Sequence, residues 1–455
     1  MLVIFVSSTE RRYTDMYVSP PGNGPQQLLL QGVVNRNFRA VKAALEAGAN
    51  INGTKEHPLP PITAATIADE FAVVNFLLAQ GADPNRPFPM ELPRPPMPEI
   101  AIVIPGERAL HIAARNGYVE VVSLLLKTGR ANPNVTEIRG YTPLNATCDS
   151  MHGNVDAVVQ LLLEAGADPA LADNAGCIPL HIAAQRGFVG AVDMLCSKAP
   201  ATVNVCVTKF RTALFFACTG DQEGVVSKLL SAGAMQPRPL VDDGMPLSIA
   251  AGQGFVGVVR VLLSERGMEA IGGGGALPNA LYAAIHARRT LIIRLLLAAY
   301  GEGKRSEWAN AYLDGKPMLH YSAGYCYPAG VSILLEAGAD ETVCDSEGHI
   351  PLCAVGGFLG QCGEPDMDRM EEIAVLRMLE RGPAYRARSW AWPADEEADA
   401  GGGSGDGDAA STADVVPSSP AVKTPPAIGV RIFRPKKKCS RKLFVRHIGR
   451  YCAKD

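Results

Sequence analysis

Long apolar runs are scarce in this sequence. A helix that crosses a membrane needs about 18 to 20 consecutive apolar residues, and the longest candidate, from Leu291 to Ala299, contains Arg294. The apolar start, Met1 to Val6, is far shorter than the core of a secretory signal, and no basic segment leads it. We therefore expect neither a membrane span nor secretion.

Closely spaced cysteine pairs are also absent. The eleven cysteines, an odd number, include no Cys-x-x-Cys pair, which favours a reducing compartment over a disulfide framework. One set of possible zinc ligands is too widely spaced, and a second has three members where structural zinc needs four. The sets are Cys326, Cys344, Cys353 and Cys362, and Cys439, His447 and Cys452. We expect no metal site.

Motifs for catalysis or cofactor binding are missing too. Gly272 to Gly275 lacks the Lys-Ser or Lys-Thr that follows in a phosphate-binding loop, and Gly303-Lys304 is followed by Arg305. No Ser/His/Asp or Cys/His set can be assembled, because the candidate histidines recur at one position of an internal repeat. We predict a protein that is not an enzyme and that takes no cofactor or small-molecule substrate.

The charge of the chain is unevenly distributed. The net charge of -3 combines a segment with seven acids and no base, residues 395–414, with a segment of ten Lys or Arg and one acid, residues 431–455. Outside these segments and Lys423 there are 32 basic and 38 acidic residues. A mildly acidic body is a poor match for a broad nucleic-acid surface.

An internal repeat organises most of the chain. The residues that begin successive apolar helices are mostly 33 or 34 residues apart, and the exceptions are longer. This spacing is typical of one compact supersecondary unit with occasional loop insertions. The ten anchors are Leu29, Ile62, Leu110, Leu144, Leu180, Leu214, Leu247, Leu281, Leu319 and Leu352.

Two further registers follow each anchor. A valine or isoleucine comes twelve residues later and a leucine or cysteine sixteen residues later, with insertions in the fourth and tenth units. Residues four apart share a helix face, which needs a neighbour to cover it. The first register is Val41, Val74, Val122, Val158, Val192, Val226, Val259, Ile293, Val331 and Val375. The second is Leu45, Leu78, Leu126, Leu162, Cys196, Leu230, Leu263, Leu297, Leu335 and Leu379.

Turn residues separate the helices of each unit. Thr142-Pro143 combines an N-cap side chain with a proline at the first helical position. Seven residues after the anchor, a glycine can take the positive φ that reverses the chain between two helices. It occurs at Gly117, Gly187 and Gly254, Gly153 is expected to fill the same place in the fourth unit, and Arg36, Asp69, Asp221 and Arg288 replace it elsewhere.

These features resemble the ankyrin-repeat family. The matching stretches are ALHIAA at 109–114, GYTPL at 140–144, LLLEAGADP at 161–169, GCIPLHIAA at 176–184 and LLEAGAD at 334–340. The resemblance covers residues 29–382. It implies an all-α solenoid of about ten helix-turn-helix units with β-turn or hairpin loops, which binds other proteins.

The family has a histidine directly after the anchor leucine. This chain has it at His111, His181 and His320, and replaces it with Asn145 in the fourth unit and Phe215 in the sixth. Because the three histidines recur with the repeat, we expect each to make a structural hydrogen bond to the neighbouring turn.

The chain divides into four parts. Residues 1–28 are an N-terminal segment and candidate cap, and residues 29–393 are the repeat domain. Residues 394–427 are rich in Gly, Ser, Ala, Asp and Pro and predict a disordered linker, because they cannot bury enough apolar surface. Residues 428–455 form a basic tail that extends the disordered C-terminal region.

Insertions interrupt the repeat domain. Seven prolines in residues 86–106 favour an extended conformation, either as a ligand for an aromatic-lined groove or as a surface loop. We prefer the loop, because no basic residue lies correctly beside a Pro-x-x-Pro core. Residues 301–313 and 356–370 are also expected to be surface loops.

The basic tail has two interpretations. A compact run of cations resembles a nuclear import signal, and it could equally serve as an electrostatic tail for acidic partners or the acidic linker. The cations are Lys436, Lys437, Lys438, Arg441 and Lys442.

The resemblance also implies where a partner binds. In this family, partners lie against the loop tips and the first helices. An aromatic residue between two cations at a tip resembles a binding hot spot, although Phe210 could instead fold onto the next unit. The predicted partner-binding residues are Ile138, Arg139, Tyr141, Asn174, Lys209, Phe210 and Arg211.

The leading hypothesis is a non-catalytic scaffold or adaptor that binds a protein along units three to six. The alternative is a nuclear regulatory protein whose basic tail directs import or contacts nucleic acid. Both place the protein in the cytoplasm, the nucleus or both.

Overall fold

A computed structural model describes residues 24–55, 57–89, 104–151, 153–207, 211–236, 246–271, 273–299, 302–355 and 369–380. These residues fall into two compact bodies, divided between Ala283 and Ala284. The predicted linker, the basic tail and most of the N-terminal segment lie outside the described residues.

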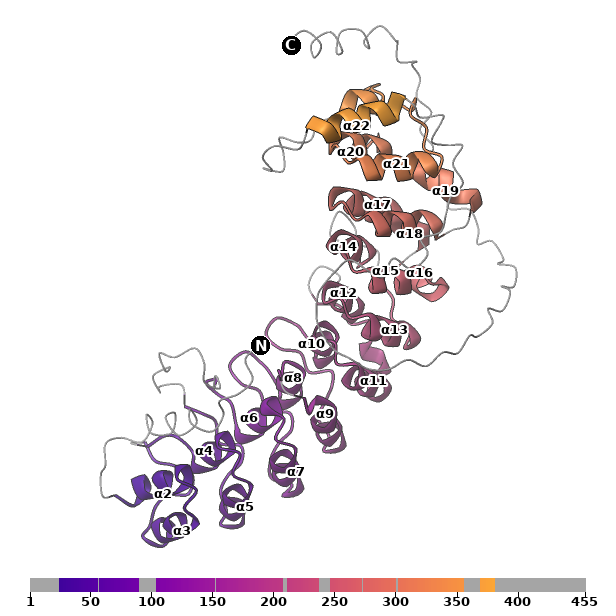
Figure 1. Cartoon of the computed structure of the whole chain (residues 1–455). Helices are drawn as coiled ribbons and strands as arrows, with labels where there is room; N and C mark the ends of the chain where they lie inside the picture. Colours follow the sequence, from indigo (N-terminus) through magenta and orange to yellow (C-terminus); the bar gives the residue numbers. More distant parts are fainter. Residues whose placement is uncertain are drawn as a thin grey trace, which may run out of the picture. The chain divides into compact units, whose positions relative to one another are not determined.

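The first body is a stack of antiparallel helix pairs. In Figure 1 the first helices form one row and the second helices another. The pairs are α2 (Pro25–Val34) with α3 (Phe38–Glu46), α4 (Pro61–Ile67) with α5 (Phe71–Ala79), α6 (Ala109–Asn116) with α7 (Val119–Lys127), α8 (Pro143–Cys148) with α9 (Val155–Glu164), α10 (Pro179–Arg186) with α11 (Val189–Lys198), α12 (Ala213–Thr219) with α13 (Glu223–Ser231), and α14 (Pro246–Gln253) with α15 (Val256–Leu262). Three short helices follow second helices: η1 (Pro200–Thr202), α16 (Glu265–Ala270) and η3 (Gly273–Ala276).

The second body continues the same pattern. Helix α17 (Leu277–His286) contains the boundary and is followed by α18 (Thr290–Ala298), α19 (Glu302–Ala309), α20 (Met318–Gly324), α21 (Pro328–Glu336), η4 (Pro351–Ala354) and α22 (Arg369–Glu380). Strands β1 (Tyr312–Leu313) and β2 (Lys316–Pro317) form a small antiparallel hairpin. Its two-residue turn, Asp314-Gly315, has positive φ at both positions, as a tight hairpin requires. The all-α repeat prediction is therefore confirmed.

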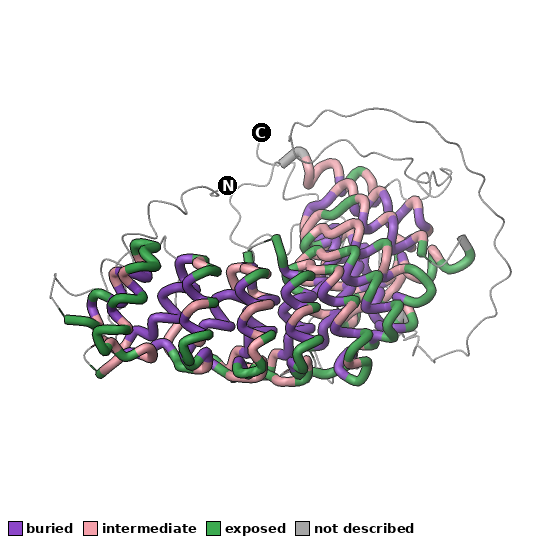
Figure 2. Tube along the Cα trace, turned by 90° about the horizontal axis from the view of Figure 1, so that it is seen from below, coloured by how far each residue is buried: buried purple, intermediate pink, exposed green. Residues whose placement is uncertain are grey.

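The predicted valine register is the centre of each unit. All ten of its members are 0% exposed. Burying a valine side chain stabilises the fold by about 1.5–3 kcal/mol, so this register is a substantial part of the core. Figure 2 shows buried residues along the packed helix faces and exposed residues along their outer sides.

The leucine register needs a correction. Leu45, Leu126 and Leu263 are half-buried, and in six of the ten units the position one residue earlier is the more deeply buried one, whereas Leu162, Leu297, Leu335 and Leu379 are themselves buried. Positions three and four residues after the valine both lie about one helical turn away, so both can share its buried face. In those six units the earlier residues are Ala44, Leu77, Leu125, Leu195, Leu229 and Leu262, which are at most 1% exposed.

Most interhelical turns adopt the predicted left-handed conformation. Gly117, Gly187 and Gly254 have φ of 71°, 85° and 96°. Other residue types are held in the same region, where a side chain raises the energy, so the packing of the two helices dictates the turn. They are Arg36, Asp69, Asp221, Arg288 and Cys326, with φ between 47° and 56°.

The fourth unit departs from this pattern. Gly153, expected to fill the interhelical position, does not have positive φ. The connection between α8 and α9 is longer, and none of its described residues, 149–151, 153 and 154, has positive φ. Counted back seven residues from Gly166, as Val41 is from Gly48, the equivalent valine is Val159 and not Val158. Both are fully buried.

The repeated histidines make the predicted structural hydrogen bonds. His111 accepts from the Arg108 N–H through Nδ1 (3.3 Å) and donates through Nε2 to the Tyr141 carbonyl (3.0 Å). Through Nε2, His181 binds the Val205 carbonyl (3.0 Å) and His320 binds the His349 carbonyl (2.8 Å). Each histidine therefore connects a first helix to the next loop.

Asn145 replaces this histidine in the fourth unit with a neutral amide. Its Nδ2 donates to the Cys177 carbonyl (3.4 Å), and its Oδ1 accepts from the Thr142 hydroxyl (2.7 Å). The contact to the next loop is thus kept without a titratable group.

The three predicted surface loops have different outcomes, and residues 356–368 of the last one lie outside the described residues. Most of residues 301–313 form α19 and β1, so that expectation was wrong; the segment includes Ala309, which is 0% exposed and anchors the helix. In the proline-rich insertion, Phe88 is buried, its N–H donates to the Glu107 carbonyl, and the Gly106 N–H donates back to Phe88. The ends of this insertion are pinned together, and residues 90–103 lie outside the described residues.

The left-handed turns allow a direct test of stability. Asp221 is exposed and has φ of 55°, so we expect Asp221→Gly to be more stable than Asp221→Ala by about 1 kcal/mol, because alanine keeps the steric cost of the Cβ. Denaturant unfolding followed by circular dichroism measures the difference. Equal stability of the two variants would contradict a strained turn.

His111 predicts a pH dependence of stability. Burial, the largest cause, lowers its pKa from 6.5 to about 4, against the hydrogen bond to Tyr141. Between these values the unfolded chain binds a proton that the folded chain does not, so stability falls as pH decreases from 6.5 to 4. Stability at higher pH is unaffected by this group.

The loss attributable to His111 is about 3 kcal/mol. We expect His111→Asn, which copies the contact of Asn145, to lose less free energy of unfolding than the wild type between pH 7 and pH 4, as measured by urea titration at each pH. A variant with the wild-type pH dependence would show that His111 is not the titrating group.

Candidate partner-binding surface

The loop tips are rigid, hydrogen-bonded turns. At the tip that precedes α10, the Asp173 carboxylate accepts from the N–H groups of Ala175 and Cys177 (both 2.8 Å), and the Asp173 N–H donates to the Cys177 carbonyl (2.9 Å). Gly176 has φ of 84°, which lets the chain turn there without steric cost. Asp345, Gly348 and His349 repeat this arrangement before η4.

Adjacent tips are connected through their backbones. The Asn174 N–H donates to the Arg139 carbonyl and its Nδ2 to the Ile138 carbonyl (both 3.0 Å). A Cβ on Gly140 would lie 2.8 Å from the Asn174 nitrogen, so the two tips touch. Asn174, predicted to bind a partner, is exposed, but its amide also holds two repeats together.

The tip before α8 brings three predicted residues together. Ile138 is 51% exposed, and the Arg139 guanidinium lies 4.3 Å from the centre of the Tyr141 ring. Buried Glu137 orients them, because its carboxylate accepts from the N–H groups of Arg139 (3.0 Å) and Tyr141 (3.2 Å) and from Arg139 Nε (3.3 Å). Burial, followed by the nearby Asp149 charge, raises the pKa of the half-buried Tyr141.

The tip before α12 has a second stacked arginine. Arg211 is exposed, its carbonyl accepts from the Val207 N–H (2.9 Å), and its guanidinium lies 5.3 Å from the centre of the Phe215 ring. The other two predicted residues of this tip, Lys209 and Phe210, lie outside the described residues.

The aromatic pair Phe215 and Phe216 was not among the predicted partner-binding residues. Both are half-buried on α12, and their rings meet edge to face at 5.8 Å between centres. Phe216 also packs against His181 of the preceding unit (5.5 Å). The sequence signal was the replacement of the repeated histidine by Phe215, which leaves an aromatic ring in place of a tip-binding imidazole.

A buried ion pair supports the beginning of this surface. The Glu107 side chain, 1% exposed, pairs with both terminal nitrogens of Arg115. Burial raises the pKa of Glu107, and Arg115 opposes the rise. The neighbouring Arg108 donates from Nη1 to the carbonyls of Gly106 and Thr136, so these charges are used within the fold.

Other candidate sites are less informative. The five cations predicted as an import signal lie outside the described residues. Among the residues that the structure describes, no group of three or more His, Cys, Asp or Glu side chains could hold a metal ion. In the same part of the chain, every helix is too short or too polar to cross a membrane.

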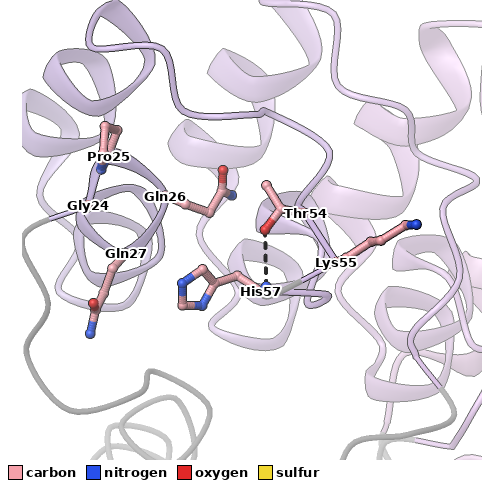
Figure 3. A pocket seen from close by; sticks show the side chains of 7 residues that line it. All are labelled: Gly24, Pro25, Gln26, Gln27, Thr54, Lys55 and His57. Atoms are coloured by element: carbon pink, nitrogen blue, oxygen red, sulfur yellow. Dashed lines mark hydrogen bonds between the residues drawn. The ribbon is translucent and has the colours of Figure 1, made fainter.

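A pocket of about 520 Å³ lies in the first unit (Figure 3). Its lining includes Gln26, whose amide pairs with the backbone N–H and carbonyl of Asn50, and Thr54, whose hydroxyl accepts from the His57 N–H (3.1 Å). None of the predicted partner-binding residues lines it.

The sequence matches known ankyrin-repeat proteins. A family model of ankyrin repeats (3 copies) matches residues 110–206 and 180–272. A putative ankyrin repeat protein YahD of Escherichia coli is 31% identical over 175 residues, which cover 34% of this chain and 87% of that protein.

Two larger proteins match only in part. The ankyrin repeat protein nuc-2 of Neurospora crassa is 26% identical, over 53% of this chain and 22% of its own length. The ankyrin repeat and KH domain-containing protein mask-1 of Caenorhabditis elegans is 36% identical, over 35% of this chain and 6% of its own length. The helix pairs, the tip turns and these matches together place the chain in the ankyrin-repeat family.

Proposed function

We propose that this protein is a non-catalytic scaffold or adaptor that binds a protein partner along the tips and first helices of units three to six. Ankyrin repeats generally mediate interactions between proteins, and this supports the class of function. The observation that carries the location is the pair of arginines, Arg139 and Arg211, stacked on aromatic rings at two exposed tips.

The composition of these tips suits a binding surface. Aromatic residues and arginine are enriched in binding hot spots, and here they occur beside the exposed Ile138. Exposed apolar surface is costly in water, and a partner that covers Ile138 would remove that cost while the neighbouring arginines provide charged contacts.

The rigidity of the tips also favours binding. Glu137 and Asp173 each accept backbone N–H groups of their own turn, and His111 and Asn145 hold the turns from the preceding helices. Because these turns are already ordered, binding of a partner would cost this chain little conformational entropy.

A co-purification experiment tests the location of the surface. We expect the combined variant Tyr141→Ala, Phe210→Ala and Arg211→Ala to recover at least about tenfold less of the proteins that co-purify with the wild type, since each hot spot contributes about 2 kcal/mol or more. Quantitative mass spectrometry of the captured proteins provides the measurement.

The matched control removes an aromatic residue and an arginine from second helices. Phe71 on α5 and Arg260 on α15 are both exposed, so Phe71→Ala with Arg260→Ala should retain the partners. Circular dichroism verifies that each variant is folded. Undiminished recovery by the tip variant, or an equal loss in the control, would place the partner elsewhere.

A further inference from the structure

The two sides of units three to six differ in charge. We define the tip side as the tips and first helices, residues 104–116, 136–149, 172–186 and 205–219, which contain six Lys or Arg and four acids. The outer side is the remaining interhelical turns and second helices, residues 117–135, 150–171, 187–204 and 220–236, with four Lys or Arg and seven acids. In a chain that is mildly acidic overall, the tip side of these units thus carries more basic than acidic residues, one of which, Lys209, lies outside the described residues.

The four acids of the tip side are already engaged. Glu107 pairs with Arg115 and Asp149 with Arg186 (2.6 Å). Glu137 and Asp173 accept from backbone N–H groups of their own tips. Glu137 also accepts from Arg139 Nε (3.3 Å). Among the described residues of the tip side, Arg139 and Arg211 are the exposed cations whose terminal guanidinium nitrogens make no recorded hydrogen bond.

Both stacked guanidiniums retain unused donors. Within the described residues, Arg211 has the Phe215 ring as its neighbour and no hydrogen-bond acceptor, and Arg139 uses only Nε, toward Glu137. An aromatic ring covers one face of a guanidinium and leaves its edge open. That edge matches a carboxylate, which accepts two parallel hydrogen bonds.

Repeat geometry sets the distance between the two arginines. They belong to the tips of units four and six, two steps apart in the stack. Packed helices lie about 8–10 Å apart, so two steps correspond to about 20 Å. An extended peptide rises about 3.3 Å per residue and spans this distance in about six residues.

We infer that the tip side of units three to six recognises an extended acidic segment of a partner protein, in which two carboxylates about six residues apart bind Arg139 and Arg211. The inference rests on the proposed function and specifies the chemistry of its partner. Ile138, Tyr141 and Phe215 supply the apolar contacts that flank the two ion pairs.

A synthetic peptide tests this chemistry with the full-length protein. The probe is a fluorescein-labelled Gly/Ser peptide with Glu at positions i and i+6 and a leucine next to each. We expect it to bind at least about tenfold more tightly than the same peptide with Gln in place of Glu, as measured by fluorescence anisotropy. A third peptide, with the two Glu at i and i+2, should bind as weakly as one with a single Glu.

Variants of the protein locate the contacts. We expect Arg139→Gln and Arg211→Gln each to weaken binding of the Glu peptide about fivefold or more, and the Lys variants to restore only part of it, because an ammonium lacks the two-pronged edge. Arg260→Gln, on the exposed outer side, should bind like the wild type.

Three outcomes would overturn the inference: equal binding of the Glu and Gln peptides, indifference to Arg139 and Arg211, or tighter arginine-dependent binding of a single-stranded oligonucleotide of similar length. If the tip variant loses co-purified partners that Arg139→Gln and Arg211→Gln both retain, the proposed function stays in place and only the acidic-segment inference is overturned. Partners retained by the tip variant would instead remove the proposed surface.

Discussion

The structure depends on burial of one apolar face per helix pair. A two-helix unit is too small to cover its own valine and leucine positions, so each unit is stable only when a neighbour lies against it. The ten fully buried members of the valine register are the direct expression of that constraint. It also explains why Asp221 and Arg288 are held at positive φ: the burial of both helices outweighs the steric cost of the turn between them.

Polar contacts then order the loops that this packing brings close. His111 and His181 use Nε2 and Asn145 uses Nδ2 to reach the same kind of target, a backbone carbonyl of a following loop. These bonds convert extended connections into rigid tips. The two imidazoles titrate and the amide does not, so the units make equivalent contacts with different sensitivity to pH.

The candidate surface follows from this rigidity. The Glu137 and Asp173 carboxylates accept hydrogen bonds within their own tips, and the tip side contains more basic than acidic residues although the chain is acidic overall. Arg139 and Arg211, two repeats apart, are each stacked on an aromatic ring of their own unit. An interaction surface of regular spacing thus arises from a repeat whose main requirement is burial of its core.

The sequence by itself determined the repeat, its family and most of its core, because a period of 33 or 34 residues and one buried helix face leave a pattern in the order of residues. It also located the structural histidines and the exposed tip that carries Arg139. Only the tertiary structure decided that Asn174 joins two tips, that Gly153 is not a left-handed turn, that residues 302–309 are helical, and that Phe215 supports Arg211. The Asn174 contact joins different units, and the other features depend on how a connection, an insertion or a side chain packs in three dimensions, which does not follow from the local order of residues.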